Sequence, residues 1–209
     1  MENFYEKLCI ERIEQLLMTY NYQYDSINKL FKKQFIVNDN ILEKIIYLDR
    51  SNKNYVLYIQ EKYLNKEVIK YLGDIPNTEL DFLILVVLLN LNVITIPNKQ
   101  TIDYNHTYNV ISDFKTKLIN SNYEYNNITR KYFKSILTFR TPFYLSIYLD
   151  TIKDILIISE EYSSIDLQSD TNFKLNLEGN NLIRYNGSIP KTKLELSTIF
   201  DLFDLQIYS

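Results

Sequence analysis

The stretch EKIIYLDRSNKNYVLYIQEKY, which runs from Glu43 to Tyr63, carries the clearest structural signal in the sequence. Apolar and polar residues alternate through Glu43–Leu48 and again through Tyr55–Gln60, and such alternation is typical of half-buried strands. The intervening residues, DRSNKN, are turn formers. The stretch therefore predicts a β-hairpin that ends in the polar triplet Gln60-Glu61-Lys62.

Helical periodicity is found on both sides of this hairpin. Apolar residues recur every three to four positions in residues 4–20 and in Ser26–Phe35, where Asp25 is a candidate N-cap. A third helix is expected over Tyr63–Leu72, because the glycine that follows it suits a helix C-cap.

A long apolar run follows in Asp81–Val93. Because it is apolar on both faces, it predicts a central strand of a covered sheet, next to the hairpin. Alternate residues should then be buried on its two faces, with Ile84, Val86 and Leu88 on one side and Leu83, Leu85 and Val87 on the other.

The pattern changes beyond Pro97. Two helices are expected, Tyr108–Ile119 and Ile128–Leu137, and the tail after Pro190 fits either a strand pair or a short helix. Short strands should lie between the second of these helices and the tail: Phe143–Leu149, Asp154–Ser159, Phe173–Leu177 and Asn181–Tyr185. A tight turn is expected at residues 178–180.

These elements predict an α+β fold. N-terminal helices with a mixed sheet, of nuclease-like or jaw-like α/β topology, precede a helical pair and a β-rich C-terminal part. We identify no internal repeat and no flexible linker. The best boundary lies in the segment SNYEYNN, which gives an N-terminal domain of residues 1–122 and a C-terminal domain of residues 123–209.

Composition narrows the class of protein. The 209 residues include no alanine and no tryptophan but 19 tyrosines, which indicates a very AT-rich genome such as that of a virus, plasmid, organelle or parasite. The net charge of −3 argues against a protein that coats nucleic acid. A single cysteine, no signal-peptide core and a longest apolar run of only Phe82–Leu89 favour a protein of the reducing cytoplasm that does not enter the membrane.

Several kinds of chemistry are excluded by residue counts. The 3 glycines cannot form a glycine-rich phosphate loop, and 1 histidine with 1 cysteine cannot form a usual zinc site. A nucleophilic pair would have to join Cys9 to His106. Cys9 lies beside an apolar helix stripe, where cysteine usually acts as a small hydrophobe, and His106 lies in a polar segment. We therefore predict no catalytic residue, cofactor or metal.

The segment ITRKYFKSILTFR, residues 128–140, allows two interpretations. As a nucleic-acid surface it would combine basic side chains with two aromatic rings for base stacking: Arg130, Lys131, Lys134, Arg140, Tyr132 and Phe133. As a helix it would bury Ile128, Tyr132, Ile136 and Leu137 and leave the charges in solvent. The second interpretation is favoured.

The end of the hairpin raises a nuclease hypothesis. Many Mg²⁺-dependent nucleases place an acidic residue on one strand and Glu/Gln-x-Lys on the next, a pattern that Gln60 and Lys62 fit. Asp49 lies at the turn end of the hairpin, roughly 16 Å from Gln60 at about 3.3 Å per residue. Only Asp39 or Glu43 could therefore join Gln60 or Glu61 at a metal. The alternative is that the triplet is simply the polar end of a strand.

The order of elements over about residues 5–97 resembles the N-terminal jaw domain of the fifth subunit of cellular-type DNA-dependent RNA polymerases. In that family a helix, a Tyr-containing turn and a second helix precede a hairpin, a further helix and an apolar strand. The resemblance implies a nuclease-like fold without catalytic residues and docking to a polymerase core. The C-terminal assembly motifs of the family are missing, apart from an echo in Leu182-Ile183-Arg184.

We therefore expect a non-enzymatic protein-interaction subunit that contacts nucleic acid weakly or indirectly. A small RNA polymerase subunit of the jaw and assembly type is the specific candidate. The alternatives are a Mg²⁺-dependent nuclease that uses the residue 43–63 hairpin and an accessory binding protein of a virus or plasmid.

Overall fold

The computed structural model describes residues 4–49, 56–91, 104–136, 143–162 and 181–205. The chain folds as two compact units, residues 1–102 and residues 103–209. The boundary expected at 122/123 differs from this division, because the helix that opens the second unit packs with that unit's last helix.

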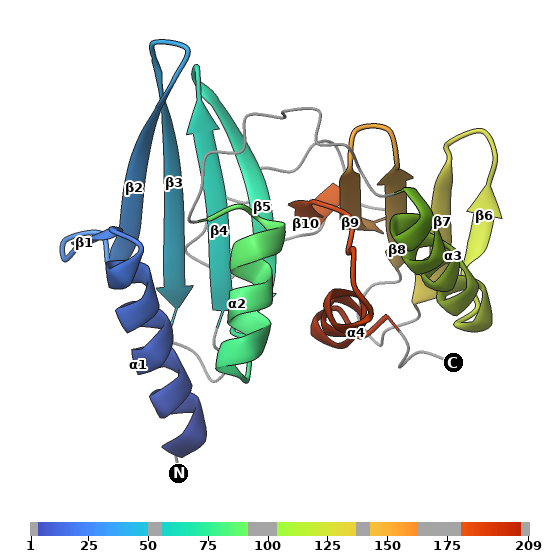
Figure 1. Cartoon of the computed structure of the whole chain (residues 1–209), viewed down its shortest axis with the longest axis horizontal. Coiled ribbons are helices and arrows are strands. Elements are labelled where there is room, and N and C mark those ends of the chain that lie inside the picture. Colours follow the sequence, from blue (N-terminus) through green and yellow to red (C-terminus); the bar gives the residue numbers. More distant parts are fainter. Residues whose placement is uncertain (1–3, 50–55, 92–103, 137–142, 163–180, 206–209) are drawn as a thin grey trace. The chain divides into compact units, whose positions relative to one another are not determined.

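The first unit joins two helices to an antiparallel sheet (Figure 1). Its sheet order is β1-β2-β3-β4-β5, and each strand pairs with its neighbour in sequence. The elements are α1 Phe4–Thr19, β1 Gln23–Asp25, β2 Leu30–Val37, β3 Asn40–Asp49, β4 Val56–Tyr63, β5 Lys66–Asp74 and α2 Glu79–Leu88.

Both helices of this unit lie over the same face of the sheet (Figure 1). The hydroxyl of Tyr22, just after α1, donates to the carbonyl of Leu91 beyond α2 at 2.7 Å. The core between the layers includes Ile13, Leu17, Ile46, Leu57, Ile59, Tyr71, Phe82 and Leu85, all completely buried.

The second unit repeats this order of elements, with α3 in the place of α1 and α4 in the place of α2. Its sheet order is β6-β7-β8-β9-β10, again antiparallel throughout. The elements are α3 Tyr104–Asn120, β6 Glu124–Asn126, β7 Lys131–Ile136, β8 Phe143–Asp150, β9 Ile155–Tyr162, β10 Asn181–Gly187 and α4 Lys193–Leu202. The rings of Phe114 and Phe200 pack edge to face between α3 and α4, with centroids 5.4 Å apart.

The two units are therefore copies of one fold, and their sequences also correspond. NYQYDSINK, residues 21–29, matches NYEYNNITR, residues 122–130, and IYLD occurs at 46–49 and at 147–150. GDIPNTELD, residues 73–81, matches GSIPKTKLE, residues 187–195. The expectation that the chain holds no internal repeat is wrong. The first two matches are 101 residues apart, whereas the third is 114 residues apart, so the repeat period holds only over the first part of each unit.

Local geometry repeats as closely as the sequence does. Asn21 and Asn122 both end a helix with positive φ, 62° and 64°. Tyr22 N–H donates to Leu17 and Tyr123 N–H donates to Leu118, at 2.9 Å and 3.0 Å. Two units with this much common detail indicate a tandem duplication.

Two segments expected to be helical are strands. Ser26–Phe35 contains most of β2 and Tyr63–Leu72 contains most of β5. The reason lies in the turns: Asn38-Asp39 and Leu64-Asn65 all have positive φ, which is the geometry of tight two-residue hairpins. Asp25 caps the four-residue turn between β1 and β2 instead of a helix.

The apolar segment Asp81–Val93, expected to be a strand, is largely the helix α2. Short apolar runs do not distinguish a buried strand from a buried helix. The missed signal is Thr78, whose hydroxyl accepts the N–H of Asp81 and caps the helix. As expected, Ile84, Leu85, Val86 and Leu88 are buried, but Val87 faces solvent.

The predicted α+β class is confirmed, but the sheets are antiparallel instead of mixed. The expected hairpin, the first helix and the helix at Tyr108–Ile119 are also confirmed. Ile128–Leu137, expected as a second helix, is mainly the strand β7, and the ambiguous tail forms α4. Phe173–Leu177 and the turn at residues 178–180 lie outside the described residues.

Candidate interaction surface

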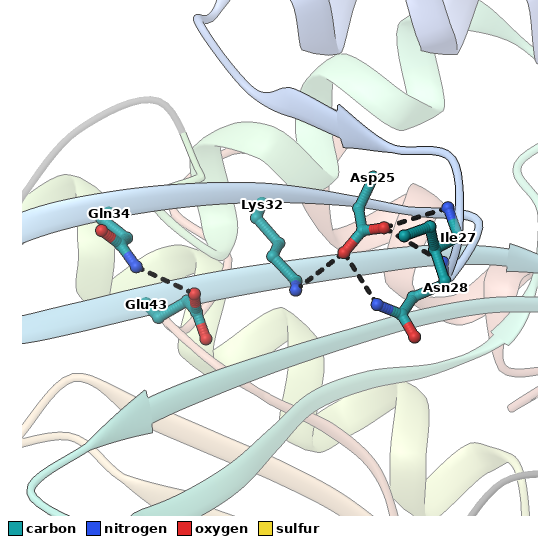
Figure 2. A network of polar contacts seen from close by, with 6 residues as sticks. All are labelled: Asp25, Ile27, Asn28, Lys32, Gln34 and Glu43. Carbon is teal, nitrogen blue, oxygen red and sulfur yellow. Dashed lines mark hydrogen bonds and ion pairs between the residues drawn. The ribbon is translucent and has the colours of Figure 1, made fainter.

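The polar end of the β3–β4 hairpin forms a ladder of paired side chains. Glu43 lies directly opposite Lys62 across the two strands. Glu43 accepts a hydrogen bond from the Gln34 amide at 3.1 Å (Figure 2). Lys62 pairs with Glu67 of β5 at 2.6 Å, and Gln60 donates to the other oxygen of Glu67 at 2.7 Å. Lys62 thus neutralises Glu67, and the amides of Gln34 and Gln60 each donate to a carboxylate on the same face of the sheet.

The remaining candidates of the nuclease hypothesis lie elsewhere. Glu61 faces the opposite side of the sheet, where its carboxylate lies 3.5 Å from the buried amino group of Lys44. Asp39 occupies the β2–β3 turn, and Asp49 lies opposite Val56 at the far end of the ladder. In the described part of the chain, no three His, Cys, Asp or Glu side chains are placed to hold a metal ion. The polar end of the hairpin therefore shows one ion pair and hydrogen-bonded side chains where the hypothesis required a metal cluster.

The turn between β1 and β2 is organised by one carboxylate. Asp25 accepts the N–H groups of Ile27 and Asn28, the Asn28 side-chain amide at 2.8 Å and the Lys32 amino group at 3.0 Å (Figure 2). These hydrogen bonds, chiefly those from Asn28, lower the pKa of Asp25. The carboxylate thus holds the backbone in a fixed turn and carries Ile27 at its tip.

The second unit repeats this turn with an amide. Asn126 stands in the place of Asp25, and its side-chain oxygen accepts the N–H groups of Ile128 at 2.9 Å and Thr129 at 3.1 Å. A ring pair flanks each turn: Tyr24 packs on Phe31, and Tyr125 packs on Tyr132, with centroids 5.0 Å and 4.8 Å apart. The two turns therefore share the same backbone hydrogen bonds, the same capping position and a pair of packed aromatic rings beside the turn.

Each turn presents apolar side chains to solvent. Ile27 at the first tip is 89% exposed, and Ile128 at the second tip is 93% exposed. Three further pairs of matched positions are also exposed and apolar in both units: Met18 with Ile119, Tyr24 with Tyr125, and Leu80 with Leu194. We call the turn residues Tyr24 and Ile27, and their counterparts Tyr125 and Ile128, the two turn surfaces.

Sequence reasoning missed these surfaces. It treated Ser26–Phe35 as a helix and placed Ile27 and Ile128 in apolar stripes. The signal that could have found them is the recurrence of Asn-Tyr-x-Tyr before each turn, at Asn21 and at Asn122.

The basic segment of residues 128–140 does not form a basic face in its described part. Lys131 pairs with Glu161 at 2.7 Å, and Tyr132, Lys134 and Ile136 are buried. Burial of Tyr132 and Ile136 agrees with the favoured interpretation, whereas the burial of Lys134 and the exposure of Ile128 do not. Arg140 and Leu137 lie outside the described residues.

Cys9 and His106 belong to α1 and α3, and so to different units. Their side chains lie outside the described residues, so the structure does not test the hypothesis of a nucleophilic pair. Among the described helices, none is both long and apolar enough to cross a membrane.

Comparisons of this chain with models of protein families, with characterised proteins and with solved structures found no match.

Proposed function

We propose that this protein is a non-enzymatic interaction module whose two units each offer a turn surface to a protein partner. The observation that carries the proposal is the exposure of Ile27 and Ile128 at equivalent tips. Single exposed apolar residues are normal on protein surfaces and need no explanation. Here the same positions are exposed and apolar in two copies whose sequences have otherwise diverged widely.

The fold does not account for these side chains. A polar residue would fit either tip, because the Asp25 or Asn126 cap requires only the backbone N–H groups that follow it. Large aliphatic and aromatic side chains on rigid turns contribute strongly when a partner buries them. Two equivalent surfaces on one chain favour a partner that presents the same apolar site twice, such as a symmetric dimer, because the second contact is then intramolecular.

RNA polymerase is the first partner to test. The element order behind the resemblance differs from the observed order, since Ser26–Phe35 and Tyr63–Leu72 are strands. The polymerase is therefore a candidate from the sequence resemblance, while the turn surfaces support a protein partner of any kind.

The test is affinity purification of the tagged full chain from its host, with polymerase subunits and other partners identified by mass spectrometry. Ile27→Asp and Ile128→Asp should each weaken capture of a given partner, and the double variant should abolish it. Ile152→Asp is the matched control, because Ile152 is 93% exposed at a β8–β9 turn capped by Asp150 but is not one of the matched pairs. Equal capture by all the variants would contradict the proposal.

A separate assay addresses the enzyme alternative. The protein is incubated with supercoiled, linear and single-stranded DNA and with RNA, in Mg²⁺ or Mn²⁺. We expect no cleavage, because Lys62 and Glu67 are engaged with each other. Metal-dependent cleavage that disappears in Lys62→Ala would contradict the non-enzymatic module and support the nuclease hypothesis.

A further inference from the structure

Two buried polar groups in the second unit lack acceptors. The amino group of Lys134 and the hydroxyl of Tyr123 are enclosed, and neither has a hydrogen-bond partner in the described part of the chain. They belong together, because the Lys134 amino group lies 5.6 Å from the centre of the Tyr123 ring. Continuing the β6–β7 register by one position also places these two residues opposite each other.

The first unit contains the same pair with its acceptors present. Lys33 lies over the Tyr22 ring at the same 5.6 Å. Its amino group donates to the carbonyl of Tyr20 at 2.7 Å, and the Tyr22 hydroxyl donates to the carbonyl of Leu91 at 2.7 Å. The matched pair shows that both groups act as donors in this fold and that each one reaches an acceptor oxygen.

The two carboxylates of β9 do not fill this role in the second unit, because each has a basic partner of its own. Glu160 pairs with Arg184 at 3.6 Å, and Glu161 pairs with Lys131 at 2.7 Å. An enclosed ammonium with no acceptor is costly, and so is an enclosed hydroxyl. Burial raises the pKa of Tyr123, so its hydroxyl keeps the proton and remains a donor.

We propose that the second unit binds a small oxyanion, a carboxylate or a phosphate, between Lys134 and Tyr123. One oxygen accepts from the Lys134 amino group and another accepts from the Tyr123 hydroxyl. The pair lies beside Glu124 and Phe133, where the outermost strand of the second unit's sheet, β6, begins to pair with β7. This site is separate from the turn surfaces and does not depend on the proposed interaction function.

The test measures thermal unfolding of the full chain in acetate, phosphate or chloride at constant ionic strength. A bound oxyanion should raise the Tm by about 5 °C at ten times its Kd, relative to chloride. The arm that responds, acetate or phosphate, identifies the source of the oxygens. Tyr123→Phe should weaken the response, and Lys134→Met should abolish it.

The repeat supplies the control. Lys33→Met and Tyr22→Phe change the equivalent pair, whose donors already have acceptors, and should leave the anion response in place. The isosteric Tyr123→Phe keeps the test valid if Lys134→Met fails to fold, which circular dichroism would reveal. No response to either oxyanion in the parent chain, or an unchanged response in Tyr123→Phe and Lys134→Met, would overturn the proposal.

Discussion

Lysine side chains from the sheet stabilise the ends of both helices of the first unit. Neither α1 nor α2 has a basic residue in its last turn. Instead, Lys33 donates to the carbonyl of Tyr20 after α1, and Lys44 donates to the carbonyl of Asn90 after α2. Cations at helix C-termini interact favourably with the exposed carbonyls. Sequence analysis of the helices alone cannot identify these caps, because they come from β2 and β3.

Lys44 provides a test of this arrangement. Lys44→Met should lower the free energy of unfolding by about 2 kcal/mol, because it leaves the Asn90 carbonyl and the Glu61 carboxylate with fewer partners. The matched change is Lys62→Met on the same hairpin, where the side chains of Lys62 and Glu67 are 41% and 39% exposed and their pair should contribute about 0–1 kcal/mol. Urea denaturation measures both. Equal losses would show that burial of Lys44 adds nothing.

Gly73 shows how closely the backbone approaches a buried ring. A Cβ at this position would lie 2.9 Å from the Tyr71 hydroxyl oxygen. The Tyr71 ring is fully buried and its hydroxyl donates to the carbonyl of Asp74, so it has little freedom to move. Gly73→Ala should therefore destabilise the protein by about 1–3 kcal/mol.

A double-mutant cycle checks this explanation. Tyr71→Phe removes the atom that the new methyl group would meet first. Gly73→Ala should then cost less in the Tyr71→Phe background than in the parent chain. The same cost in both backgrounds would show that the hydroxyl adds nothing to the strain, since the ring carbon Cζ, 3.0 Å from the added Cβ, remains in Tyr71→Phe.

At the scale of elements, the sequence predicted what local alternation and helical periodicity determine. The β3–β4 hairpin, α1, α3 and the strands β8 to β10 follow from such patterns. Among the misassigned elements, β2 and β5 are those whose identity depends on turns. Asn38, Asp39, Leu64 and Asn65 adopt positive φ without glycine, and the low glycine content of the chain hid these hairpins.

The helix α2 offers a direct comparison of two neighbours. In a strand buried on both faces, Val86 and Val87 would be equally intolerant of polar substitution. In the helix, Val86 is 1% exposed and Val87 is 59% exposed. Val86→Asn should cost about 3 kcal/mol through lost packing and a buried amide, whereas Val87→Asn should cost less than about 0.5 kcal/mol. Chemical denaturation of both variants measures the difference in the free energy of unfolding. Equal costs would indicate that this segment is a strand buried on both faces.

At the scale of the whole molecule, the duplication places two related sequences on the same fold. It supplies a two-sequence comparison within one chain, which separates residues the fold requires from residues it merely permits. Asn21 and Asn122 are matched for backbone reasons, because both end a helix with positive φ. Ile27 and Ile128 are matched at exposed positions, where the fold makes no such demand. The candidate surface was not predicted because exposure at a turn tip depends on the fold of each unit.

Buried tyrosines in both units predict how the protein responds to alkali. Burial, and to a lesser degree the charge of Glu67, raises the pKa of Tyr58 to about 12. Burial also raises the pKa of Tyr22, Tyr123 and Tyr185. A tyrosine in the unfolded chain loses its proton near pH 10, so above that pH the unfolded state binds fewer protons than the folded state.

Stability should therefore be intact below about pH 10 and should fall as the pH rises toward 12, through the folded-state pKa of Tyr58. Ionisation of the buried tyrosines should coincide with unfolding, which tyrosinate absorbance and far-ultraviolet circular dichroism can follow in one titration. Tyr58→Phe removes one of the linked groups, so the fall of stability with pH should be less steep than in the parent chain. Complete ionisation of all 19 tyrosines with the dichroism unchanged would show that these rings are not buried as described.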